Sequence, residues 1–239
     1  MKLRNDAALK AVLGTWRISV ERLPPTRAEI TAIYDRKARH WSAILHRLGY
    51  DQAYRNLFRR LEQSRALGHL RHGGRVLDCG IGAGALSLAL LESLHFKFHL
   101  TGLDLSPRMI EEAKRRLTSA GARFDLYCRD VSSLPLGGEK FDLVMCGHLI
   151  EHLPDPLDGM RRMAESLSPG ALLLAIVTRP GRLGSLIHLR YRNQCIHPGS
   201  LARGMKQIGL TNIRLLQLDA CPVWCRWLSY VCVATNPGA

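Results

Sequence analysis

The sequence contains no apolar run near the ~20 residues that a membrane-spanning helix needs, so we expect no transmembrane segment. Its first residues, MKLRNDAALKAVLGTWR, have neither the apolar core nor the cleavage site of a secretory signal. Its seven cysteines are an odd number without zinc-type pairs, and no metal site is predicted. These absences indicate the reducing cytoplasm, with peripheral attachment to the inner membrane surface left open.

Acidic residues are also scarce. The chain has 34 Lys and Arg against 20 Asp and Glu, which gives a formal net charge of +14. Such a balance favours contact with an anion, whether a nucleic acid, an anionic membrane surface or a phosphorylated small molecule. The charge does not discriminate between these partners.

With 239 residues, 46% of them hydrophobic, the chain can fold around a large core. Apolar residues at three- and four-residue steps predict a helix over residues 5–22, and a second helical region spans about 27–70. From residue 74 onward, strand-like and helix-like segments alternate, which predicts right-handed crossovers and a mostly parallel sheet. A closing hairpin makes the last strand antiparallel. We therefore divide the chain into N-terminal helices (1–72) and an α/β domain (73–239).

The stretch VLDCGIGAGALSLALL begins as a strand and continues as a helix, with Gly80, Gly82 and Gly84 between them. Glycine lets a ligand approach the main chain closely. The turn lacks the Lys-Ser/Thr of a P-loop, and its two-residue period does not fit the G-x-G-x-x-G fingerprint. A tight strand-to-helix turn without a ligand is the alternative.

Three acidic residues stand at the ends of consecutive predicted strands: Asp78, Asp104 and Asp130. In a doubly wound sheet these ends meet at the ligand-binding crevice, where an acidic residue binds ribose hydroxyls. Asp78 is then placed to accept from an ammonium group, Asp104 from a ribose and Asp130 from an adenine amino group. Each aspartate taken alone is more often a helix cap.

These motifs together resemble those of class I S-adenosylmethionine-dependent methyltransferases. The pattern E/D-x-G-x-G-x-G is met from Asp78 to Gly84, and D-x-S-x-x-M-x-x-x-A from Asp104 to Ala113. FDLVMCGHLIEHLPDP and LSPGALLLAI are similar to later motifs of the family. The resemblance covers about residues 74–235. It implies a Rossmann-like, seven-stranded sheet with an antiparallel last strand, S-adenosyl-L-methionine as cofactor, and cofactor contacts from Asp78, Cys79, Gly80, Gly82, Gly84, Asp104, Leu105, Met109, Asp130, Val131, Cys146 and Gly147.

The cofactor carries an activated methyl group, so the protein must align the acceptor and exclude water. A general base is needed only if the acceptor loses a proton. His148 is the first candidate and His152 the second, with Glu151 beside them, and either histidine could instead be a polar loop residue. The stretch AIYDRKARHWSAIL resembles the N-terminal cover of methyltransferases that act on quinone precursors and phospholipid head groups, with Tyr34 closing the pocket.

Residues 178–200 form a second added segment that contains no acidic residue. Such a segment could bind phosphate or carboxylate groups of an acceptor, or it could be a solvated basic loop. Its candidate substrate-binding residues are Arg179, Arg182, His188, Arg190, Tyr191 and His197.

The sequence thus predicts a methyltransferase for a small amphiphilic or anionic acceptor, with a phospholipid head group or a quinone-like precursor favoured. The predicted helix over residues 5–22 could lie in a membrane interface, and the alternative is that its apolar stripe packs on its own domain. An RNA methyltransferase, favoured by the charge, is the alternative. A non-catalytic cofactor-binding partner subunit is the third possibility, and the oligomeric state is not predicted.

Overall fold

The computed structural model describes residues 9–20, 25–180, 196–219 and 228–238. Their main sheet has seven strands in the order β5-β4-β3-β6-β7-β9-β8. The strands are β3 (Arg75–Cys79), β4 (His99–Asp104), β5 (Arg123–Cys128), β6 (Phe141–Gly147), β7 (Leu167–Thr178), β8 (Thr211–Leu216) and β9 (Ser229–Thr235).

Strands β3 to β7 run parallel, and β9 is antiparallel to both of its neighbours, β7 and β8. The predicted fold class is therefore confirmed. The antiparallel strand lies one position in from the sheet edge, because β8 pairs along its outer side. The chain runs outward from β3 through β4 to β5 and then returns to β6 beside β3. The order reverses there, so the crevice between the carboxyl ends of β3 and β6 is where this topology binds ligands.

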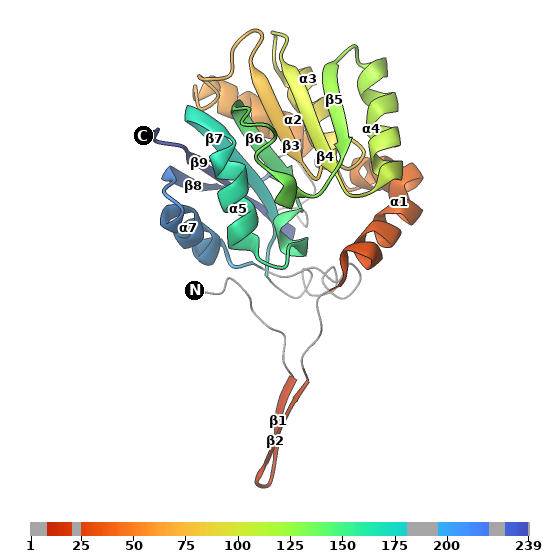
Figure 1. The fold of residues 1–239 in the computed structure, drawn as a ribbon, viewed down its shortest axis with the longest axis vertical. Helices are drawn as coiled ribbons and strands as arrows, with labels where there is room; N and C mark the ends of the chain where they lie inside the picture. Colours follow the sequence, from red (N-terminus) through yellow and green to blue (C-terminus); the bar gives the residue numbers. More distant parts are fainter. Residues whose placement is uncertain (1–8, 21–24, 181–195, 220–227, 239) are drawn as a thin grey trace.

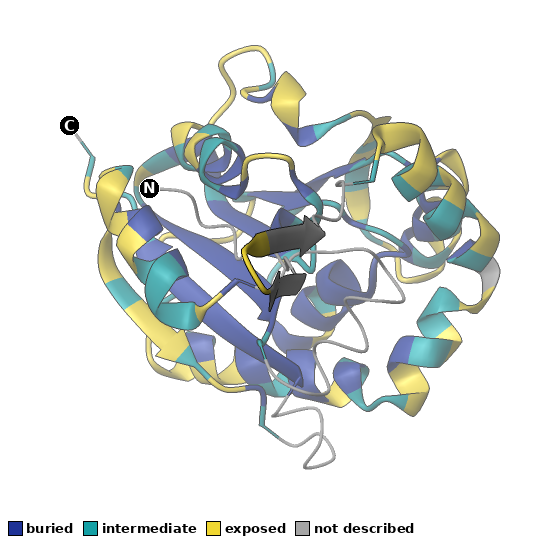
Figure 2. Cartoon of the chain, turned by 90° about the horizontal axis from the view of Figure 1, so that it is seen from below, coloured by how far each residue is buried: buried dark blue, intermediate teal, exposed yellow. Residues whose placement is uncertain are grey.

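Helices cover both faces of the sheet (Figure 1). Helices α2 (Tyr50–Gln63), α3 (Ala85–Ser93) and α4 (Pro107–Ser119) pack on one face, as the buried Phe58, Leu90 and Leu117 show. Helices α5 (Pro156–Glu165) and α7 (Pro198–Gln207) pack on the other through Met163 and Met205. The inner strands β3, β4, β6, β7 and β9 are largely buried between them, whereas the edge strands β5 and β8 are not (Figure 2). Because α2 shares a core with the sheet, the predicted boundary after residue 72 separates segments that pack together.

Helix α1 (Arg27–Arg47) begins with a capping box, in which the Thr26 hydroxyl accepts from the Glu29 N–H and the Glu29 carboxylate accepts from the Thr26 N–H. The predicted helical region 27–70 is in fact two helices, separated at Gly49, whose φ of 75° is left-handed. Ala38 of α1 packs against Ala83 and Met109 at the strand ends. Helix α1 thus covers the crevice, as expected for the N-terminal segment.

The predicted helix over residues 5–22 is wrong where the structure describes it. Strands β1 (Leu9–Leu13) and β2 (Trp16–Val20) form a separate two-stranded antiparallel hairpin. Gly14, with φ of 58°, and Thr15 make the two-residue turn, and glycine at the first turn position is typical of such hairpins. A mid-helix glycine costs about 0.5–1 kcal/mol. The β-branched Val12, Ile18 and Val20 also favour strands.

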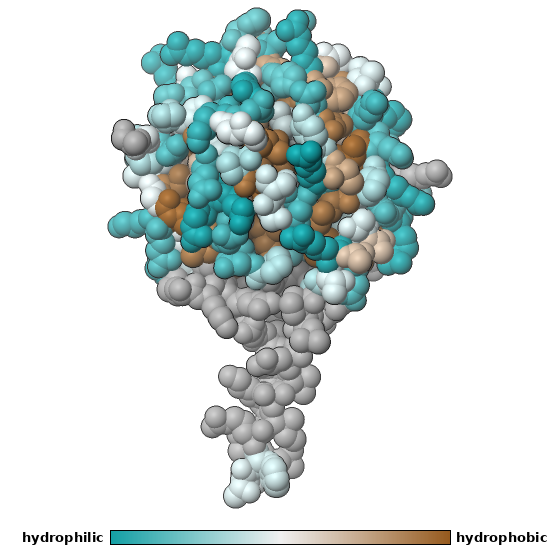
Figure 3. Space-filling model, viewed as in Figure 1, coloured by the Kyte–Doolittle hydropathy of each residue, from teal (hydrophilic) through white to brown (hydrophobic). Residues whose placement is uncertain are grey.

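Hydrophilic residues dominate the face of the body seen in Figure 3, and hydrophobic ones show between them. Among the described helices, none combines the length and the apolar character needed to cross a membrane.

Candidate functional site

A cavity of about 240 Å³ opens at the carboxyl ends of β3, β4 and β6, the point where the strand order reverses. The strand-end loops form one wall and α1 forms the other. Twelve of the residues predicted from the sequence line this cavity: Tyr34, Asp78, Gly80, Gly82, Asp104, Leu105, Met109, Asp130, Val131, Gly147, His148 and His152.

Gly80, Gly82 and Gly84 of the turn all have positive φ, but the space beside each of them differs. A Cβ at Gly80 would meet the Leu149 side chain at 3.0 Å, so this glycine allows close packing. A Cβ at Gly84, the N-cap of α3, would meet Ala113 of α4 at 3.8 Å, and Gly84 does not line the cavity. A Cβ at Gly82 would meet nothing within 4 Å. Gly82 is therefore the glycine beside open space, where a ligand can reach the backbone.

Asp78 is 1% exposed and accepts a 2.6 Å hydrogen bond from the Ser87 hydroxyl of α3. Burial raises the pKa of Asp78 to about 7, with the Ser87 hydrogen bond opposing the rise and the charge of Asp104 adding to it. A cationic group in the cavity would favour the ionised form. The carboxyl is thus suited to accept from an ammonium group, as the sequence predicts.

Asp104 holds the glycine turn in place. Its Oδ2 accepts from the Gly82 N–H at 2.8 Å and its Oδ1 from the Ser106 N–H at 2.9 Å. Burial raises the pKa of Asp104 above its ordinary value, and these two N–H groups oppose the rise. Each carboxylate oxygen keeps a second lone pair, so both can still accept from a pair of hydroxyl groups.

Asp130 also lines the cavity, yet its oxygens already have partners. Oδ1 accepts from the Ser132 N–H at 2.6 Å, which caps the 3-10 helix η1 (Val131–Ser133), and Oδ2 pairs with Arg27 Nε at 3.1 Å. The helix-cap alternative therefore describes one of its roles. Its contact with an adenine amino group stays a prediction.

His148 follows β6 directly and belongs to a buried polar cluster with Glu151 and Thr178. His148 Nδ1 lies 3.3 Å from Glu151 Oε1 and 3.2 Å from Thr178 Oγ1. The Thr178 N–H donates to the same Glu151 oxygen at 3.1 Å, and so does the Thr178 hydroxyl. Since the hydroxyl proton goes to Glu151, Nδ1 must carry a proton shared by both oxygens. The other ring nitrogen, Nε2, then carries the free lone pair.

Glu151, in the 3-10 helix η2 (Ile150–His152), is completely buried. Burial alone raises the pKa of Glu151, but the hydrogen bond and charge of His148, with His152 and Thr178, outweigh it and lower the pKa below its ordinary value. Glu151 is thus a carboxylate at neutral pH, placed to orient His148 and to stabilise its protonated form.

The His148 ring and backbone are both fixed. The edge of Tyr50 packs against the ring with centroids 5.8 Å apart, and the Tyr50 hydroxyl is hydrogen bonded to Ser229 Oγ at 2.8 Å. His148 has a φ of 55°, uncommon for a residue other than glycine, and its N–H donates to the Ile176 carbonyl at 2.8 Å. Strained backbone of this kind persists where surrounding structure enforces it and often marks a functional residue.

His152 has a different environment. Its Nε2 is 2.9 Å from the Tyr34 hydroxyl, and the two rings meet edge to face at 5.6 Å. Burial lowers the pKa of His152 to about 4, with the charge of Glu151 opposing the shift and that of His148 adding to it. His152 is thus a neutral residue that binds Tyr34 of α1 to the strand-end wall. Tyr34 also packs edge to face on Trp41.

Several predicted site residues lie elsewhere. Cys79 and Cys146 are paired in register on β3 and β6, and both side chains are buried in the core under α5 and α7. Neither lines the cavity, and the prediction that these two residues contact the cofactor stays untested. Adjacent residues of a strand face opposite ways. Asp78 faces α3 through Ser87, which turns Cys79 toward the other face.

Residues 178–200, the segment predicted to bind the acceptor, are only partly described by the structure. Arg179 lies 5.6 Å from the Tyr230 ring, and the exposed His197 caps the start of α7. Neither residue lines the cavity, and their substrate-binding roles stay predictions. Arg182, His188, Arg190 and Tyr191 lie outside the described residues, so their roles stay predictions.

Other cavity residues were not predicted. From the two cover helices come Arg27, Ile30, Trp41, Leu45 and Tyr54. Burial raises the pKa of Tyr54 well above its ordinary value, so its hydroxyl stays protonated. Arg129 comes from the loop after β5. The aromatic residues of the cover were a usable signal, but helical periodicity alone does not show which of them face the crevice.

The residues at this cavity fit S-adenosylmethionine. Gly82 offers open backbone, Asp104 has spare lone pairs for two hydroxyls, and Asp78 is an acidic group at the end of β3. Leu105, Met109 and Val131 provide apolar contacts of the kind that a base requires. These groups come from successive strand ends, as expected for a nucleoside ligand in this topology.

Comparison with known proteins agrees with this fit. Residues 76–170 match a methyltransferase domain family. The chain is 35% identical over 101 residues to the ubiquinone biosynthesis O-methyltransferase of Coxiella burnetii, covering 42% of each chain. It is 30% identical over 110 residues to the demethylmenaquinone methyltransferase of Staphylococcus epidermidis, covering 46% of this chain and 45% of that one. The chain thus spans less than half the length of these curated relatives.

Among solved structures, the magnesium protoporphyrin IX methyltransferase of Synechocystis with bound S-adenosylmethionine superposes with a TM-score of 0.68. It is 17% identical, and the match covers 91% of this chain and all of that one, so the likeness is one of fold. The matched methyltransferase domain contains the glycine turn and the strand ends that build the cavity, so the predicted resemblance to class I S-adenosylmethionine-dependent methyltransferases is confirmed.

Proposed function

We propose that the protein transfers a methyl group from S-adenosylmethionine to a hydroxyl group of a small, apolar, quinone-like acceptor. The observation that carries this proposal is the His148–Glu151–Thr178 cluster, which engages Nδ1 of His148, a residue that lines the cavity, and so leaves the lone pair of Nε2 for a proton. A hydroxyl acceptor loses a proton during methyl transfer, so it gains from a positioned base. The two curated relatives, a ubiquinone biosynthesis O-methyltransferase and a demethylmenaquinone methyltransferase by name, support the class of acceptor.

The bound cofactor supplies a methyl group on a positively charged sulfur, ready for displacement by a nucleophile. Asp78, Asp104 and Gly82 would hold it through its amino group, its ribose hydroxyls and its approach to the backbone. His148 Nε2 would accept the hydroxyl proton of the acceptor. The buried carboxylate of Glu151 would stabilise the resulting imidazolium, as a carboxylate does for a histidine base in other enzymes.

Aromatic and aliphatic side chains form the cover side of the cavity, among them Tyr34, Trp41, Leu45 and Tyr54. Such a wall suits a flat apolar ring, and it excludes water from the methyl group. The Tyr34–His152 hydrogen bond fixes this wall against the strand ends. The protein's contribution is thus alignment, proton removal and shielding.

A labelling experiment tests the proposal. Purified protein is incubated with methyl-labelled S-adenosylmethionine and, in separate reactions, a quinone-containing extract, a phospholipid extract and transfer RNA, with His148→Ala as the paired control. We expect label in the quinone fraction, lost in the variant. Label in phospholipid head groups would show that the acceptor is a phospholipid and not a quinone-like compound. No label in any fraction would favour a non-catalytic cofactor-binding role.

RNA is the second candidate acceptor, because the net charge of +14 favours polyanions. The same experiment decides this point, since only incorporated label counts. Salt-sensitive binding to RNA without incorporation is expected of any protein this basic.

A further inference from the structure

The β1–β2 hairpin has two chemically different faces. Its register pairs Leu9 with Val20, Ala11 with Ile18 and Leu13 with Trp16. The intervening pairs are Lys10 with Ser19 and Val12 with Arg17. Because alternate residues of a strand belong to opposite faces, all of the wholly apolar pairs share one face of the ribbon. Both basic residues belong to the other face.

The hairpin is separate from the main sheet and projects from the end of the body where the strands terminate (Figure 1). Trp16, beside the turn, is 76% exposed, the highest value among the large hydrophobic residues that are exposed in the described part of the chain. An isolated two-stranded hairpin is marginally stable in water at best. An apolar face on such a hairpin therefore requires a surface to pack against.

The charge of the hairpin indicates what kind of surface its apolar face packs against. Residues 9–20 contain Lys10 and Arg17 and no acidic residue. Tryptophan is enriched where apolar acyl chains meet polar head groups, and basic residues are attracted to anionic lipids at about 1 kcal/mol each. Tryptophan and basic residues are both present in this hairpin.

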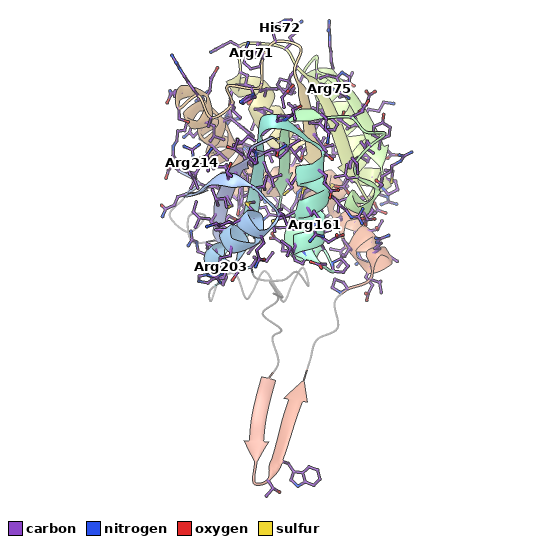
Figure 4. All side chains as sticks on the ribbon, turned by 60° about the vertical axis from the view of Figure 1, so that its left-hand side comes forward. Arg71, His72, Arg75, Arg161, Arg203 and Arg214 are labelled. Atoms are coloured by element: carbon purple, nitrogen blue, oxygen red, sulfur yellow. The ribbon has the colours of Figure 1, made fainter. Side chains whose placement is uncertain are left out.

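The basic residues labelled in Figure 4 do not select which side of the body would face a membrane. Arg71, His72 and Arg75 lie at the end of the body far from the hairpin, and Arg161, Arg203 and Arg214 lie on other elements (Figure 4). Charges at these separate places on the body attract it to an anionic surface without selecting a side. The hairpin has both basic residues and an apolar face, so it can determine which side of the body faces the membrane.

We propose that residues 9–20 dock the protein on an anionic lipid surface, with the apolar face of the hairpin and Trp16 in the membrane interface. Four residues of sequence separate Val20 from Pro25, and Pro25, Thr26 and Arg27 line the cavity. Docking by this hairpin turns the cavity end of the body toward the membrane. Delivery of a quinone-like acceptor from the lipid rests on the proposed function, whereas the docking itself does not.

Cosedimentation with vesicles of phosphatidylcholine, with and without phosphatidylglycerol, tests the docking. We expect the wild type to bind the anionic vesicles and Trp16→Glu to bind about tenfold more weakly. The variant has no aromatic side chain at this position that could move from water into the membrane interface. Leu215→Glu is the matched control, since Leu215 is 48% exposed on β8 of the main sheet. Arg17→Glu should weaken binding several-fold more than Arg71→Glu, at the far end of the body.

Binding of S-adenosylhomocysteine by each variant verifies that the cavity is intact. Vesicle binding by Trp16→Glu equal to the wild type would overturn the proposal, as would equal losses in Trp16→Glu and Leu215→Glu. A wild-type dimer in light scattering that Trp16→Glu dissolves would instead assign the apolar face to a second copy. Docking without methyl transfer would contradict only the proposed function, and methyl transfer to a soluble acceptor without docking would contradict only this inference.

Discussion

The two walls of the cavity are built differently. On the strand-end wall, the fully buried Glu151 binds His148 and Thr178 through one oxygen, and no part of this cluster depends on a long, exposed side chain. On the α1 wall, one contact is the Arg27–Asp130 ion pair, in which the Arg27 side chain is 62% exposed. A second is the hydrogen bond from the Ser106 hydroxyl to Asp35.

This difference separates two tasks. Buried, hydrogen-bonded polar groups hold reacting atoms in a fixed geometry, because breaking these bonds leaves a desolvated charge. Exposed ion pairs contribute about 0–1 kcal/mol and break readily. The strand-end wall is therefore suited to chemistry, whereas the α1 wall combines an exposed ion pair with the part-buried hydrogen bonds Tyr34–His152 and Ser106–Asp35.

The largest effect is expected from His148→Ala, on the strand-end wall. Loss of a general base should lower the rate of methyl transfer to a hydroxyl acceptor by about 10²–10⁴-fold, with cofactor affinity nearly unchanged. Single-turnover assays with labelled cofactor measure the first quantity and calorimetry the second. His95→Ala, an exposed residue before β4 that does not line the cavity, is the control and should keep the wild-type rate. A loss below tenfold in His148→Ala would contradict its role as base.

Asp104→Ala should have the next largest effect. Removing a buried acceptor of two ribose hydroxyls should weaken S-adenosylhomocysteine binding by about 1.5–3 kcal/mol, measured by calorimetry. Asp104→Asn is the matched variant, because its amide oxygen can keep one backbone N–H partner while the charge is lost. Unchanged affinity in a folded Asp104→Ala protein, judged by thermal unfolding, would rule out the ribose contact.

The pH dependence of cofactor-product binding should report on Asp78. The pKa of Asp78 is raised to about 7 in the free protein, so the carboxyl gains its charge as the pH rises through that value. An ammonium group prefers the charged form, and affinity for S-adenosylhomocysteine should rise from pH 5.5 toward pH 8, by up to about tenfold per pH unit below the pKa. In Asp78→Asn this rise should disappear. A persistent rise would assign the titration to another group.

The smallest effect is expected on the α1 wall. Arg27→Ala removes a largely exposed ion pair with Asp130, so cofactor-product affinity and unfolding free energy should each change by less than about 1 kcal/mol. Arg115→Ala, which breaks an exposed pair with Glu112 on α4, is the matched control. A large loss in Arg27→Ala alone would show that α1 is as firmly built as the strand-end wall, and the contrast between the walls would fail.

Local patterns were sufficient for the sheet and for the centre of the site. Alternating strand and helix segments predicted the parallel sheet, and the motifs placed Gly82, Asp78, Asp104 and His148 at one crevice. They were insufficient for residues 9–20, where the apolar spacing fits a helical stripe and also an alternating strand. Gly14 decides between these, because a left-handed φ at a two-residue turn pairs the flanking segments as strands.

The sequence by itself determined the topology and the strand-end carboxylates, because these follow from periodicity and from where each strand stops. Tertiary structure alone decided which groups meet across long separations. It joined Glu151 to Thr178, which fixes the proton on His148 Nδ1, and Tyr34 to His152, which attaches the cover. It also turned Cys79 and Cys146 into the core. Such pairings depend on the packing of whole elements, and no local pattern encodes them.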